Sequence, residues 1–175
     1  MDAAHFVRGS FLGCLWCATR LFVRAASGRQ RYNVLGALNA VTHELTRVTN
    51  HSYINSESVC DLLRKIAAAG WTTPITLVLD NARYQRCRLV QDLAAALGIE
   101  LLFLPSYSPN LNLIERLWKF VKKTTLHSRR RATYAEFHAA IDDCLSRLTT
   151  TYRADLTTLM THNFQTFENG PILAG

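Results

Sequence analysis

Three acidic residues that are far apart in the chain could carry chemistry together: Asp2, Asp80 and Glu115. Asp80 follows the largely apolar run ITLVL, so it lies at the end of a predicted buried strand. An ionised group there is costly unless water or a cation stabilises it. Carboxylates without thiol or imidazole partners suit a hard cation such as Mg²⁺ or Mn²⁺. Two such ions about 3.5–4 Å apart can activate a water or a 3′-hydroxyl for in-line attack at phosphorus.

Each of these carboxylates also has an ordinary structural explanation. An Asp after a strand commonly forms a turn or caps a helix. Glu115 lies at the boundary between the apolar and the basic half of a predicted helix, where it can pair with Lys119 for about 0.3–0.5 kcal/mol. Asp2 is one residue from the terminus, where side chains are usually exposed. The residue pattern alone leaves both explanations open.

The predicted elements that position these residues follow an α/β order. Strands are expected over residues 15–25, 31–40, 44–49, 75–80 and 99–104. Helices are expected over residues 55–69, 84–97, about 111–126 and 134–148, followed by a short polar tail. The first three strands are closely spaced, which indicates an antiparallel meander. The order therefore predicts one mixed sheet, in which two parallel strands, each buried on both faces, lie beside the meander.

Length and composition predict one globular domain spanning residues 1–175, with 49% hydrophobic and 19% charged residues. No apolar run is long enough to span a membrane and the start lacks a signal-peptide pattern, so we expect a cytoplasmic protein. Cys14 and Cys17 have the spacing of half a zinc or redox site, but no second half follows. The five cysteines are therefore expected to be free thiols.

Basic residues are concentrated directly after Glu115. Residues 116–131 contain seven of them and no acid: Arg116, Lys119, Lys122, Lys123, Arg129, Arg130 and Arg131. The summed charge of these seven residues equals the net charge of the whole chain, +7. A concentrated positive segment favours a polyanionic partner, most often nucleic acid. A solvated basic face is the alternative.

Two motifs in the second half of the chain resemble a known family. ITLVLDNARYQRC, followed by LLFLPSYSPNLNLIERLWKFVKK, is similar to the core of DDE transposases of the mariner-like superfamily, in particular the bacterial insertion-sequence branch. Asp80 and Glu115 are separated by 34 intervening residues, a spacing typical of the branch with a final glutamate. MDAAHF resembles the segment around the first catalytic Asp, and SGRQRYNVLGALN resembles the strand after it.

The resemblance implies a ribonuclease H-like fold, with three antiparallel and two parallel strands flanked by helices. It also implies metal-dependent DNA cleavage at transposon ends and strand transfer into target DNA, often at a TA dinucleotide. Asp2, Asp80 and Glu115 would hold two Mg²⁺ or Mn²⁺ ions, and Asn81 would orient the second carboxylate. The seven basic residues would bind DNA. Relatives act as dimers, so a homodimer is expected.

The chain departs from the family pattern at its start. Relatives have an apolar strand leading into the first Asp and a helix-turn-helix region before it, whereas Asp2 directly follows Met1. We therefore expect a truncated first strand, with Asp2 on a frayed terminus. Two hypotheses follow: an active cleavage and strand-transfer domain, or a catalytically inactive remnant that only binds DNA. A different nuclease on the same fold is less favoured, because no fourth acidic residue occupies an obvious site position.

Overall fold

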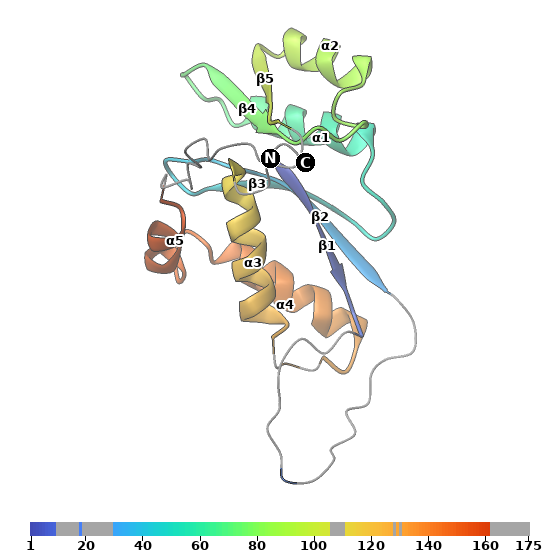
Figure 1. Ribbon diagram of the computed structural model, residues 1–175, viewed down its shortest axis with the longest axis vertical. Helices are drawn as coiled ribbons and strands as arrows, with labels where there is room; N and C mark the ends of the chain where they lie inside the picture. The colour runs from blue at the N-terminus through green and yellow to red at the C-terminus, as the bar shows by residue number, and fades with distance from the viewer. Residues whose placement is uncertain (10–17, 19–29, 106–110, 128, 130, 162–175) are drawn as a thin grey trace, which may run out of the picture.

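The computed structural model describes residues 1–9, 18, 30–105, 111–127, 129 and 131–161, and Figure 1 shows how their elements are arranged. Strands β1 (Asp2–Val7), β2 (Arg31–Leu38) and β3 (Leu45–Asn50) form an antiparallel sheet in that order. Strands β4 (Ile75–Leu79) and β5 (Ile99–Phe103) pair in parallel. The predicted α/β fold with three antiparallel and two parallel strands is confirmed.

The antiparallel sheet begins at Asp2 itself. β1 pairs with β2 along its whole length, from Asp2 opposite Gly36 to Val7 opposite Arg31. Phe6, only 1% exposed, anchors β1 in the core. The expectation that Asp2 lies on a frayed terminus is therefore wrong, because strand pairing and burial hold this segment. The strand predicted over 15–25 lies outside the described residues, except for Ala18.

The parallel pair is not buried on both faces, contrary to the prediction. Leu77 and Leu79 pack into a core with helices α1 (Ser56–Ala68) and α2 (Arg88–Ala96), whereas Leu102 on the opposite face is 51% exposed. The five strands also form two sheets in place of one continuous mixed sheet. The two sheets are linked where the Met1 nitrogen donates a hydrogen bond of 2.6 Å to the Val78 carbonyl oxygen.

Strand β2 contributes to two hydrophobic cores, because its side chains alternate between its two faces. Leu35 and Ala37 pack with α1, α2 and the parallel pair. Tyr32 and Val34 pack with α3 (Leu113–Thr125), α4 (Tyr134–Ser146) and α5 (Arg153–Leu159). Figure 1 shows these helix groups on opposite sides of the antiparallel sheet.

The helices start and end close to the predicted positions, with two exceptions. Asn55 caps α1 by accepting a hydrogen bond from the Ser58 backbone nitrogen. Helix α2 begins at Arg88 and not near Tyr84, because the preceding residues form tight turns. Helix α5 was predicted as part of a polar tail, but Leu156 anchors it in the core with no exposed surface. No helix in the described part of the chain is long and apolar enough to cross a membrane.

The cysteines that the structure describes are free, as predicted. Cys60 and Cys144 are buried and Cys87 is partly buried. Burial raises the pKa of the Cys144 thiol to about 11, so this thiol is unreactive at neutral pH. Cys14 and Cys17 lie outside the described residues.

Candidate metal centre

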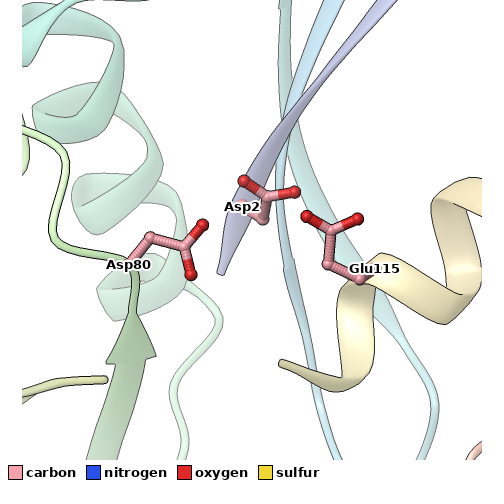
Figure 2. A group of neighbouring side chains, drawn as sticks. All are labelled: Asp2, Asp80 and Glu115. Atoms are coloured by element: carbon pink, nitrogen blue, oxygen red, sulfur yellow. The ribbon is translucent and has the colours of Figure 1, made fainter. Parts of the chain in front are cut away.

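The three carboxylates that the sequence singled out converge at one point. Asp2 begins β1, Asp80 directly follows β4, and Glu115 lies in the first turn of α3. One oxygen from each carboxylate lies within 4.8 Å of the other two, and Figure 2 shows the three groups pointing toward one another. Two oxygens on opposite sides of one hard divalent cation are about 4–5 Å apart. The three side chains can therefore share one ion after little or no movement.

Each carboxylate is positioned by the core packing of its own element. The hydrogen bond between Met1 and Val78 brings the start of β1 beside the end of β4. In α3, Ile114 and Leu117 are buried, which fixes the rotation of the helix and leaves the intervening Glu115 half-buried toward the other two acids. The alternative in which Glu115 pairs with Lys119 is not realised, since no ion pair joins them in the portion that the structure describes.

The electrostatics of the group favour a bound cation. Burial, together with the charges of Glu115 and Asp80, raises the pKa of Asp2 to about 7, while a hydrogen bond from the Ala3 backbone partly opposes the shift. Asp2 is only 9% exposed, so solvent does little to screen the repulsion. A divalent ion would relieve this repulsion. The three oxygen donors, without nitrogen or sulfur, match the preference of Mg²⁺ or Mn²⁺.

The amide that contacts Asp80 belongs to Asn112 and not to Asn81, which the sequence singled out for this task. The Asn81 side chain donates to the Leu104 carbonyl oxygen and so joins the ends of β4 and β5. Asn112 Nδ2 lies 3.1 Å from Asp80 Oδ1. Sequence reasoning missed Asn112 because the helical projection placed it on the polar half of α3, whereas it is 3% exposed. Its position three residues before Glu115 was the available signal.

Tyr84 is a second neighbour of the centre that sequence reasoning missed. Burial and the charges of Asp2 and Asp80 raise the pKa of the Tyr84 phenol, with Gln85 partly opposing the shift through a hydrogen bond. Tyr84 follows Asp80 by four residues, in the turns that precede α2.

The predicted DNA-binding residues have different environments. Lys119, Lys123 and Arg129 are exposed, and Arg131 is half-buried. The Lys122 ammonium lies 5.9 Å from the centroid of the Phe6 ring. Arg116 donates to the Leu159 and Thr161 carbonyl oxygens at the end of α5, so this guanidinium takes part in holding that helix. Arg130 lies outside the described residues.

Residues 18–138 match the family of DDE superfamily endonucleases. The match covers more than half of the chain, and the chain therefore belongs to this family. The matched segment includes Asp80 and Glu115, and Asp2 lies before it. None of the curated protein sequences compared with the chain matches it.

Several solved structures share this fold. The Mos1 transposase in a paired-end complex with the left transposon end is 14% identical with a TM-score of 0.63, covering 94% of this chain and 55% of that chain. The catalytic domain of Mos1 mariner transposase is 13% identical with a TM-score of 0.56, covering 95% and 83%. Structures of that catalytic domain with Raltegravir and either Mn or Mg are 15% identical with a TM-score of 0.56, covering 79% and 78%.

At these identities the likeness shows the fold alone, which is the ribonuclease H-like fold of transposase catalytic domains. The chain spans about 55% of the length of the Mos1 transposase in the paired-end complex. The three acids of this chain cluster as expected for a DDE endonuclease.

Proposed function

We propose that this chain is the catalytic domain of a DNA transposase, which cleaves DNA at transposon ends and transfers the new 3′ end into target DNA. In this proposal Asp2, Asp80 and Glu115 hold two Mg²⁺ or Mn²⁺ ions. The observation that carries the proposal is the approach of the three carboxylate oxygens to within 4.8 Å in a DDE endonuclease fold. Asp80 and Glu115 are separated by 34 intervening residues and Asp2 is the second residue of the sequence, so their approach is a property of the fold.

The residues present fit this chemistry. When bound, divalent cations supply Lewis-acid chemistry at a phosphodiester. The chain contributes a partly desolvated cluster of carboxylate oxygens. Burial and the neighbouring charges disfavour the ionised form of Asp2, and a bound cation would stabilise that form. Asp80 and Glu115 are only partly buried, so a backbone phosphate can approach the centre from their exposed side.

The exposed face of α3 supports DNA as the substrate. Lys119 and Lys123 follow Glu115 by four and eight residues, which is about 6 and 12 Å along the helix axis. Each can neutralise a phosphate near the one held at the centre, releasing counterions as it does so. Arg129, four residues after the end of α3, is also exposed and adds to this basic segment.

The proposal includes the finer assignments that the sequence motifs imply. They are membership of the bacterial insertion-sequence branch, a homodimer as the active assembly, and action in the bacterial cytoplasm. The Mos1 complex with a transposon end supports transposon DNA as the substrate class. The Mos1 catalytic-domain structures with Mn and Mg support either ion as the cofactor.

A metal-dependent nicking assay tests the proposal. Purified protein is incubated with supercoiled plasmid and Mg²⁺ or Mn²⁺, and nicked and linear products are separated on a gel. We expect cleavage that EDTA stops and that Asp80→Asn or Glu115→Gln abolishes. Asp61→Asn is the matched control, since this acid is exposed on α1, pairs with Arg64 and does not belong to the cluster.

The alternative, a remnant that only binds DNA, predicts a different result. It requires salt-sensitive DNA binding without cleavage and no stabilisation of the protein by divalent ions. The pairing of β1 with β2 and the burial of Asp2 weigh against it, because they remove the disorder at the start of the chain on which it depended. Cleavage that survives both substitutions would show that the assigned centre does not perform the reaction.

A further inference from the structure

We propose that Asn112 is a positioning residue that holds the three carboxylates in the arrangement that binds cations. The inference rests on the proposed function, because it assumes that these carboxylates bind divalent ions. Asn112 touches all three of the segments that carry the acids. It does so with two side-chain hydrogen bonds and one backbone hydrogen bond.

The Asn112 carboxamide connects the first two of these segments. Its Nδ2 donates to Asp80 Oδ1 at 3.1 Å and to the Met1 carbonyl oxygen, in the residue before Asp2, at 3.2 Å. An amide nitrogen has two hydrogens, so both are used. Asn112 is 3% exposed, and water therefore competes weakly for these bonds.

The Asn112 backbone connects the third segment. Its carbonyl oxygen accepts from the Glu115 nitrogen at 3.1 Å, in the first turn of α3. Because Asn112 is the N-cap residue directly before α3, its hydrogen bond to Asp80 ties the first turn, which carries Glu115, to the end of β4. One residue thus couples the positions of Asp80 and Glu115.

The direction of the Asn112 side chain is unusual for its position. An Asn at the N-cap position, directly before a helix, normally accepts a hydrogen bond from a backbone nitrogen of the first turn of that helix. Asn55 does this at the start of α1 in the same chain, accepting from Ser58 at 3.0 Å. The Asn112 side chain makes no capping hydrogen bond. Its amide is turned away from its own helix and toward the acidic cluster, so helix capping does not explain the residue.

An uncharged donor suits this place chemically. Three clustered carboxylates repel one another, and the Asn112 amide steadies Asp80 without adding a charge that would compete with a cation. It engages one oxygen of Asp80 and leaves the other available as a ligand. Groups that orient ligands in this way typically contribute 10- to 100-fold to metal affinity.

Mn²⁺ binding by the whole chain tests the inference. Asn112→Leu removes the amide with little change in size, and Mn²⁺ affinity is measured by the loss of the free-ion signal in electron paramagnetic resonance. The matched control is Asn33→Leu, which removes an equally buried amide from β2. Asn33 is 1% exposed, donates to Asn50 and Ser52, both at 3.0 Å, and is hydrogen-bonded at 2.7 Å to His5, three residues along β1 from Asp2.

We expect Asn112→Leu to bind Mn²⁺ about 10- to 100-fold more weakly than the wild type. Asn33→Leu should keep wild-type Mn²⁺ affinity even if it loses stability. DNA binding without metal should be unchanged in both variants. This separates positioning from a general loss of stability, which would affect both variants alike.

Wild-type Mn²⁺ affinity in a folded Asn112→Leu protein would overturn the inference and leave the proposed function standing. Absence of Mn²⁺ binding by the wild type would instead overturn the proposed function. If Asn112→Leu does not fold, Asn112→Gln and Asn33→Gln replace the pair. Weaker Mn²⁺ binding by Asn112→Gln alone then supports the inference, and equal binding by the two refutes it.

Discussion

Replacing Asp2 with Asn is expected to stabilise the cation-free protein at high pH and to abolish its stabilisation by Mg²⁺. Burial, with the charges of Glu115 and Asp80, raises the pKa of Asp2 from 3.8 to about 7. The folded state therefore binds this proton more tightly than the unfolded state. The resulting contribution to stability is fully present below about pH 4 and is lost as pH rises through about 7.

The size of this effect follows from the pKa shift. A shift of about three units corresponds to about 4 kcal/mol, at about 1.4 kcal/mol for each unit. About 2–3 kcal/mol of this is lost between pH 5 and pH 8. Asn cannot ionise, so the Asp2→Asn protein should lack this part of the pH dependence. The comparison of the two proteins cancels the titration of groups that are remote from Asp2.

Urea unfolding followed by circular dichroism, with EDTA at pH 5 and pH 8, measures the difference. The experiment is then repeated at pH 8 with Mg²⁺ at 100 times its dissociation constant, which should add about 2.7 kcal/mol to the wild type. The variant should gain nothing from Mg²⁺. Equal pH dependence in the two proteins, or equal stabilisation by Mg²⁺, would refute the reasoning.

Three further predictions concern the fold and the basic face. Gly36→Ala should lower the free energy of unfolding, measured in urea, by about 1–3 kcal/mol, because the new Cβ would lie 3.0 Å from the Trp118 ring. Leu156→Ala should lower the free energy of unfolding by about 2–5 kcal/mol, since α5 is anchored in the core through this side chain. An unchanged free energy of unfolding would show that this anchor does not stabilise the fold. Lys119→Ala and Lys123→Ala should each reduce the slope of log affinity against log salt concentration for DNA binding by about 1. A slope unaffected by both changes would place the DNA elsewhere.

Most of the fold could be predicted because local signals agreed with it. The turn signal Ser27-Gly28-Arg29 followed by the strand-like segment 31–40 identified β2, and the apolar positions of one helix face identified α1. β1 was missed because the segment DAAHFV contains few residues that favour strands, and it is held by pairing with β2. Helix α5 was missed because it is short and largely polar, and it is held by the buried Leu156 and by the hydrogen bonds of Arg116 to its end. These two elements depend on tertiary contacts that no local window contains.

The candidate site was predicted in part for the same reason. Asp80 and Glu115 belong to motifs in which neighbouring residues define a strand end and a helix start. The contribution of Asn112 was missed, because its amide reaches a carboxylate 32 residues away and a carbonyl 111 residues away. The polar half of a helical projection does not distinguish a solvated amide from one that is turned inward.

The most direct test of the shared centre is a crystal structure of the protein soaked in Mn²⁺, with anomalous scattering used to locate the ion. We predict an anomalous peak between β1, β4 and α3, with carboxylate oxygens of Asp2, Asp80 and Glu115 coordinating it and any second ion beside it. A structure in which Mn²⁺ binds elsewhere, or in which the Asp80 and Glu115 carboxylates point into separate regions, would contradict the account.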